Sequence, residues 1–301
     1  MAMEILRELK KIPDLSLALG FFDGVHIGHK AVIEKAVEFA KKNNTKSAVI
    51  TFSEHPSHYF YKICPKYILT KEAREEKIEK LGVDYIFELE FGDLSGLTAQ
   101  DYLKDLLINH FTPSAISTGW NHTFGYNQSG SPKFLEQNSK KFGYEYFEIP
   151  PQKFKHHIIS STAIRDFLFE GDLESANSML GYNFTVGGEV IEGQKLGREI
   201  GFRTANIKYP NELVDIPSGV YSVSVKIEND ENFYRGIANF GTRPTVSDNS
   251  EKSLETHILD FEKDIYGKNI EIEFLKMIRQ EKKFSSLEAL KNQIVTDIKS
   301  I

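Results

Sequence analysis

The sequence contains a single cysteine, Cys64, among 301 residues, so no disulfide can form within the chain. One thiol also excludes a structural zinc site built from cysteines. No apolar run approaches the roughly 20 residues that a membrane-spanning helix needs. The first residues, MAMEILRELKKIPD, lack the apolar segment of a secretory signal. We therefore expect a soluble, cytoplasmic protein without a membrane partner.

An excess of charge of one sign is also absent. The chain has 37 basic and 43 acidic side chains and a formal net charge of −6, with no basic arm or acidic tail. This balance argues against a nucleic-acid partner. Aromatic residues are abundant, with 22 Phe and 13 Tyr, and suffice for buried cores. A length of 301 residues exceeds that of an ordinary domain and indicates two domains.

Residues 15–150 alternate short apolar runs with longer amphipathic stretches. This alternation predicts a parallel sheet with helices on both faces. The expected strands are 15–20, 47–52, 84–90, 114–119 and 144–150, and the expected helices are 29–43, 70–82, 98–111 and 131–143. Parallel sheets bind ligands at the carboxyl ends of their strands, so the loop after the first strand is the first candidate site.

The pattern changes after residue 181, following two short helices that start at Ser161 and Asp172. Strand-like runs then succeed one another without a long helix between them, which predicts a small antiparallel β-barrel. The expected strands are 184–193, 219–228, 233–241, 253–261 and 269–279, and a helix over 285–300 ends the chain. We place the domain boundary after residue 182, which gives domains 1–182 and 183–301.

The loop after the first expected strand reads GFFDGVHIGH, residues 20–29. A glycine-bearing turn into a helix N-terminus presents backbone amides to phosphate. Two imidazoles can add hydrogen-bond donors, and Gly28 permits close approach of a ligand. Such groups suit adenylyl transfer, which needs positioning and charge stabilisation. A plain strand–helix turn with capping histidines is the alternative. The candidate nucleotide-binding residues are Phe21, Asp23, Gly24, His26, Gly28 and His29.

A second segment, ISSTAIR at residues 159–165, places Ser161, Thr162 and Arg165 around another helix start. Hydroxyls and an arginine can bind phosphate there, although an ordinary N-cap with a surface arginine would explain the segment alone. Together, HxGH and SSTxxR resemble the nucleotidyltransferase superfamily. The longer string GFFDGVHIGH resembles the prokaryotic bifunctional riboflavin kinase/FMN adenylyltransferases, also called FAD synthetases. The resemblance implies a Rossmann-like first domain that transfers AMP from ATP to FMN, with His26 and His29 acting on the α-phosphate.

The stretch GQKLGREIGFRTAN, residues 193–206, resembles the riboflavin kinase signature GxGRGRxLGFPTAN. It departs from that signature at Leu196 and Arg203. The resemblance implies that Thr204 and Asn206 also hold Mg²⁺, for which a hydroxyl and an amide oxygen are suitable ligands. A loop between two strands is the alternative. The implied ATP-binding residues of the kinase are Gly193, Gly197, Arg198, Thr204 and Asn206.

The segment LETHILDF, residues 254–261, resembles the E-x-H-L-L-D-F segment of the same family. This resemblance implies that Glu255 is the general base on the ribityl 5′-hydroxyl of riboflavin. Arg279 and Phe284 match an R-x-E-x-x-F pattern near the flavin, where planar groups could pack against isoalloxazine. Packing of the C-terminal helix is the alternative role for these two residues.

The family pattern GxDFxFGxxRxG corresponds here to GWNHTFGYNQSG, residues 119–130. Asn121, His122 and Gln128 replace the acidic, aromatic and basic residues of that pattern, while Asn121 and Phe124 occupy positions implied to bind flavin. Three functions stay open: a bifunctional enzyme using riboflavin, FMN and ATP, a riboflavin kinase with a degenerate first domain, and a non-enzymatic flavin-binding regulator. We expect a monomer or a weak homo-oligomer.

Overall fold

The computed structural model divides by its contacts into two compact units, each described here by itself. The residues that the structure describes are 3–62, 64–193, 201–243 and 251–301. The first unit comprises Met1–Pro65 and Lys71–Ser161, and the second comprises Lys66–Thr70 and Thr162–Ile301. Contacts thus place residues 162–182 with the second unit, whereas the boundary after residue 182 places them with the first. That boundary stays a prediction for the functional domains.

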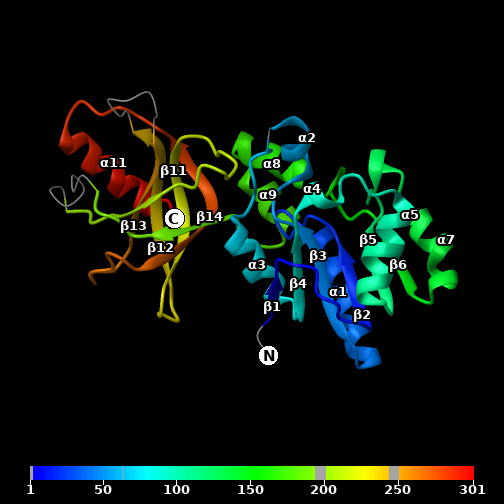
Figure 1. Cartoon of the computed structure of the whole chain (residues 1–301). Coiled ribbons are helices and arrows are strands. Elements are labelled where there is room, and N and C mark those ends of the chain that lie inside the picture. Colours follow the sequence, from blue (N-terminus) through cyan, green and yellow to red (C-terminus); the bar gives the residue numbers. More distant parts are fainter. Residues whose placement is uncertain (1–2, 63, 194–200, 244–250) are drawn as a thin grey trace. The chain divides into compact units, whose positions relative to one another are not determined.

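Six parallel strands form the sheet of the first unit, in the order β1–β4–β3–β2–β5–β6 (Figure 1). Their bounds are β1 Glu4–Leu6, β2 Leu15–Leu19, β3 Lys46–Phe52, β4 Tyr85–Leu89, β5 Ala115–Gly119 and β6 Glu145–Ile149. The predicted parallel sheet is confirmed, and only the three-residue β1, too short to show a period, is added within the described chain. Because β2 lies between β3 and β5, the strand order reverses beside it. The loops after β2 and β5 therefore leave the sheet at its topological switch point, where such folds bind ligands.

Helices cover both faces of this sheet, as predicted. On one face α1 packs against β2, β3 and β5. On the other face Leu15, Leu17 and Leu19 share a core with leucines of the segment after α5. The expected helix over 98–111 is divided by a π-helix, Tyr102–Ile108. The helices are α1 Ile27–Asn43, α2 Pro56–Tyr61, α3 Lys71–Lys80, α4 Phe91–Leu94, α5 Ala99–Asp101, α6 Asn109–Phe111 and α7 Pro132–Phe142.

The second unit is built on six antiparallel strands in the order β10–β13–β12–β11–β14–β9. Their bounds are β9 Thr185–Glu189, β10 Ala205–Lys208, β11 Gly219–Ile227, β12 Phe233–Arg243, β13 Glu251–Ile258 and β14 Asn269–Gln280. The two edge strands are β10 and β9. Just after β9, the amide of Ile191 donates to the carbonyl of Asn206 in β10 at 2.8 Å, and this bridge connects the two edges of the sheet. The expected antiparallel barrel is confirmed, with β10 as a strand that the sequence pattern does not indicate.

Three further helices accompany the barrel: α8 Ser161–Glu170, α9 Leu173–Leu180 and α11 Leu287–Lys299. Asp172 caps α9 as expected, because its side chain accepts from the amide of Ser175. In β11 the side chains of Tyr221, Val223 and Val225 are buried as the alternation predicts, but Val220 and Ser222 of the opposite face are buried as well, so the first half of the strand is covered on both faces. A pair of short strands, β7 Lys153–Phe154 and β8 His157–Ile158, lies before α8. None of the helices in the described part of the chain has the length and apolarity to cross a membrane.

Candidate active sites

The loop between β2 and α1 follows a strained path. Phe22 and Val25 have φ values of 58° and 36°, in the left-handed region that non-glycine residues rarely adopt. Gly24, with φ 81°, takes the same region at little cost. Such residues cost about 1–3 kcal/mol each and persist only where the surroundings fix them. Here Phe22 and Val25 are both buried, so packing against the body of the first unit holds the loop.

Two imidazoles stand at the N-terminus of α1. His26 is the N-cap, and its Nδ1 accepts from the amide of His29 at 3.2 Å. The rings of His26 and His29 stack with centroids 3.6 Å apart. Since Nδ1 of His26 accepts, its ring N–H is on Nε2. His26 is 5 % exposed, so this donor lies in surroundings with little water, where hydrogen bonds to an anion are strong.

Ser161 at the start of α8 is joined to the same loop. Its hydroxyl donates to the carbonyl of Asp23 at 2.8 Å, and Asp23 is itself buried. Thr162 and Arg165 fall in the second unit, so their part in this site stays a prediction. The geometry thus brings Asp23, His26 and Ser161 together at one end of the parallel sheet.

The loop after β5 contains the expected flavin-binding positions. Asn121 is exposed. Phe124 is 7 % exposed and packs against Tyr102 and Phe134, so most of its ring is occupied by the core. His122 stacks on Phe124 with centroids 5.7 Å apart, and burial lowers its pKa to about 4. His122 is therefore a neutral aromatic ring at neutral pH that packs against Phe124.

The site expected in the second unit is assembled by cross-strand register. Glu255 in β13 is paired with Asn206 in β10 and with Asn239 in β12. Directly paired residues of neighbouring strands project to the same face of a sheet. The register therefore places a carboxylate between two amide side chains. Asn239 is absent from the predicted site residues, although it matches the first position of an N-x-G-x-R-P-T motif, and its pairing with Glu255 adds it to the site.

Thr204 and Asn206 border a pocket of about 100 Å³, together with Gly193. The amide nitrogen of Asn206 donates to the hydroxyl of Thr204 at 3.3 Å, which turns its carbonyl oxygen away from that hydroxyl. Glu255 lies beside Asn206 in register but is not among the described residues that line this pocket. Gly197 and Arg198 lie outside the described residues.

A hard cation fits the oxygen donors of this pocket. A Cβ on Gly193 would lie 2.5–2.7 Å from the side-chain atoms of Asn206, so the glycine keeps open a cradle over that amide. Hydroxyl and amide oxygens are donors that Mg²⁺ accepts. No group of three or more His, Cys, Asp or Glu side chains within the described ranges is arranged to hold a metal.

Gly193→Ala is expected to displace the side chain of Asn206, since the new methyl group cannot fit beside it. A shift of about 1 Å in a positioning residue costs up to roughly 100-fold in rate. We expect the ATP-dependent reaction that the resemblance implies at this pocket to slow by about 10- to 100-fold. The control is Gly187→Ala in β9, where the nearest atom lies at an ordinary 3.6 Å. Equal kinetics for the two variants would contradict the role of Gly193.

Arg279 is engaged within the protein. Its Nε donates to both carboxylate oxygens of Asp297 at 3.1 and 3.0 Å, and its Nη2 lies 2.9 Å from Oδ2. The guanidinium also lies 5.6 Å from the ring centroid of Phe284. This ion pair attaches α11 to β14, which supports the packing role left open by the sequence. Flavin binding by Arg279 and Phe284 stays a prediction.

Asp297→Ala should destabilise the second unit, because it removes the buried carboxylate that pairs with the partly buried guanidinium of Arg279. Breaking a buried ion pair from one side costs about 3–5 kcal/mol. Urea unfolding of the full chain measures this loss, with the exposed Glu288→Ala on the same helix as the control. If both variants unfold alike, the ion pair does not fix α11.

Residues that hold the loop after β2 from outside are absent from the sequence-based predictions. Thr51 and Arg74 both donate to the carbonyl of Phe21, and Glu88 binds Arg74. The sequence carried one signal, which is the carboxylate of Glu88 within the apolar strand YIFEL. A charged side chain in a buried strand requires a partner, although spacing does not say which one.

Comparison with known proteins covers both parts of the chain. A family model described as FAD synthetase matches residues 9–163, and one described as riboflavin kinase matches residues 180–301. A crystal structure described as a macrolide-efflux protein from Streptococcus pneumoniae has a TM-score of 0.88 and 31% identity, covering 99% of this chain and 98% of its own. That likeness shows that the fold extends over the whole chain.

Two relatives have the same description, bifunctional riboflavin kinase/FMN adenylyltransferase. The one from Haemophilus influenzae is 35% identical over 304 residues, covering 99% of this chain and 98% of its own length. The one from Listeria monocytogenes is 36% identical over 285 residues, covering 93% of this chain and 89% of its own length. With both family models matched in order, this chain belongs to the family of bifunctional riboflavin kinase/FMN adenylyltransferases.

Proposed function

We propose that this chain makes FAD from riboflavin in two ATP-dependent steps, one at each of the sites described above. Family membership makes it an enzyme of flavin cofactor synthesis, with a riboflavin kinase domain and an FAD synthetase domain. One observation supports assigning one step to each domain. The range of residues that each family model matches includes one of the two polar sites. The imidazole-bearing loop lies within residues 9–163, and the Asn206–Glu255–Asn239 row lies within residues 180–301.

In the kinase step, Glu255 accepts the proton of the ribityl 5′-hydroxyl. The hydroxyl oxygen then bonds to the γ-phosphorus of ATP while ADP leaves, which gives FMN. Thr204 and Asn206 would hold Mg²⁺, which when bound offsets the negative charge of the phosphates. Gly193, Gly197 and Arg198 would bind the nucleotide, while Arg279 and Phe284 would contact the flavin.

In the adenylyl step, a phosphate oxygen of FMN bonds to the α-phosphorus of ATP and pyrophosphate leaves. His26 and His29 donate to the α-phosphate oxygens, which gather negative charge in the transition state. The other proposed roles are nucleotide binding by Phe21, Asp23, Gly24 and Gly28, pyrophosphate binding by Ser161, Thr162 and Arg165, and flavin binding by Asn121 and Phe124. A cytoplasmic monomer or weak homo-oligomer that binds neither membrane nor nucleic acid completes the proposal.

Product analysis tests both steps. The purified chain is incubated with ATP and Mg²⁺, with riboflavin in one reaction and FMN in the other, and the flavins are separated by chromatography. We expect FMN and FAD in the first reaction and FAD in the second. FMN without FAD at saturating ATP would identify a riboflavin kinase with an inactive first domain. Bound flavin without any product would identify a regulator.

A further inference from the structure

A buried arginine links the ends of three strands to the strained loop of the first unit. We propose that Arg74, anchored by Glu88, is a positioning residue for adenylyl transfer that fixes the loop carrying His26 and His29. The inference deepens the proposed function of the first unit and rests on it. It gives a positioning role to two residues that are not among the candidate substrate-binding residues described above.

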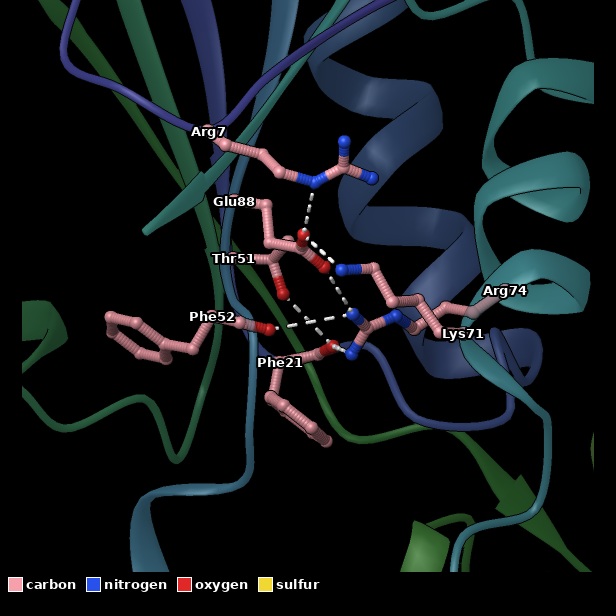
Figure 2. A network of polar contacts seen from close by, with 7 residues as sticks. All are labelled: Arg7, Phe21, Thr51, Phe52, Lys71, Arg74 and Glu88. Atoms are coloured by element: carbon pink, nitrogen blue, oxygen red, sulfur yellow. Dashed lines mark hydrogen bonds and ion pairs between the residues drawn. The ribbon is translucent and has the colours of Figure 1, made fainter. Parts of the chain in front are cut away.

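Arg74 in α3 reaches the carboxyl ends of β2, β3 and β4 at once (Figure 2). Its Nη1 donates to the carbonyl of Phe21 at 3.3 Å, and its Nη2 donates to the carbonyl of Phe52 and to Oε1 of Glu88, each at 3.4 Å. The guanidinium also lies 4.8 Å from the ring centroid of Phe21. One planar group thus binds both the backbone and the side chain of Phe21.

Glu88 holds that guanidinium in place. Its side chain is 1 % exposed, and it also receives Nζ of Lys71 and Nε of Arg7, the latter at 3.3 Å (Figure 2). A carboxylate with this burial requires such partners, since an unpaired buried charge is costly. Arg74 is 5 % exposed and is equally dependent on Glu88. The ion pair therefore fixes the position of both side chains. Through its hydrogen bonds, Arg74 also fixes the carbonyl groups of Phe21 and Phe52.

The loop needs this support because of its backbone. The strained residue Phe22 directly follows the carbonyl that Arg74 binds, and Val25 lies three residues further on. The hydroxyl of Thr51 donates to the same carbonyl at 3.1 Å, so two donors fix Phe21 before the strained turn begins. Strained backbone persists only where its surroundings determine it from several sides. Removing Arg74 frees the start of the loop and lets the imidazole of His26 leave its productive place.

Kinetics of the full chain test the proposal, because riboflavin phosphorylation in the second unit serves as an internal reference. We expect Arg74→Met to lower kcat for FMN adenylylation by roughly 10- to 100-fold, with a smaller change in the KM for ATP, since imidazole placement matters most in the transition state. Arg74→Lys keeps the charge but cannot reach both carbonyls, so we expect only partial rescue.

Arg7→Met is the matched control. Arg7 binds the same carboxylate but its side chain is 65 % exposed, and exposed ion pairs contribute little. We expect this variant to keep both activities within about twofold. Wild-type kcat for adenylylation in Arg74→Met would overturn the proposal, as would an equal loss of both activities together with easier unfolding.

Hydrogen exchange separates this inference from the proposed function. In Arg74→Met we expect faster exchange at the backbone amides of residues 22–28, with exchange in β11 unchanged, and in Arg7→Met no change at either place. If wild-type protein makes no FAD from FMN, the proposed function fails, while the exchange result still decides whether Arg74 fixes the loop. Unchanged exchange at residues 22–28 would overturn the positioning role.

Discussion

Glu255→Gln should remove riboflavin phosphorylation almost completely and leave the conversion of FMN to FAD at its wild-type rate. General-base catalysis contributes about 10²- to 10⁴-fold, and an amide cannot take up the proton of the 5′-hydroxyl. The substitution preserves size and keeps a polar side chain between Asn206 and Asn239, so the barrel should stay folded. Steady-state rates of FMN and FAD formation, each from its own substrate, give the two activities.

The matched control for this variant is Glu271→Gln, an exposed carboxylate in β14 of the same barrel. It should phosphorylate riboflavin at the wild-type rate. A folded Glu255→Gln protein that loses both activities would contradict separate sites. One that retains riboflavin phosphorylation would remove Glu255 from the reaction.

His26→Asn should lower FMN adenylylation by about 10²- to 10³-fold, the usual cost of losing one preorganised donor to an oxyanion. Asn is among the preferred N-cap residues, so it can replace His26 at the start of α1 while removing the Nε2 donor. Riboflavin phosphorylation should be unchanged. FAD formation from FMN at saturating ATP measures the effect directly.

Two further variants separate the imidazole from the cap. His26→Ala should show the same loss of activity and also lose about 0.5–2 kcal/mol of stability, because it removes the cap as well. His110→Asn, a change of the same kind in α6, should leave both activities intact. If His26→Asn makes FAD normally, the imidazole acts as a helix cap and not on the nucleotide.

The regular parts of the fold follow from local sequence pattern. Apolar runs bounded by turns predict β2 to β6, and strict alternation predicts β11, because period and burial are linked within a single element. The four residues of β10 come shortly after the glycine-rich stretch of residues 193–201, and a run so short has no recognisable period. The π-helix of Tyr102–Ile108 also gives no signal, since its apolar residues fit an ordinary helix equally well.

The site residues also fall into two groups: those that local sequence predicts and those that only the fold brings together. GFFDGVHIGH predicts its loop because the contributing residues are contiguous, and His26 caps α1 as that spacing allows. Arg74 and Glu88 act on this loop from positions more than fifty residues further along the chain. Their contact depends on which strands become neighbours, and that is a property of the sheet order. Asn239 becomes a site residue for the same reason, through its register with Glu255.

The strand register that places Glu255 also limits how this barrel can change in length. Side chains alternate between the two faces of a strand, so a one-residue insertion or deletion within β13 before Glu255 would turn its carboxylate to the opposite face. The same shift would turn the buried side chains of Thr256 and Ile258 outward, so the kinase site and the stability of the barrel would be lost together. Natural changes of length in this part of the chain should therefore fall in the turns and leave the strands that carry Asn206, Asn239 and Glu255 intact.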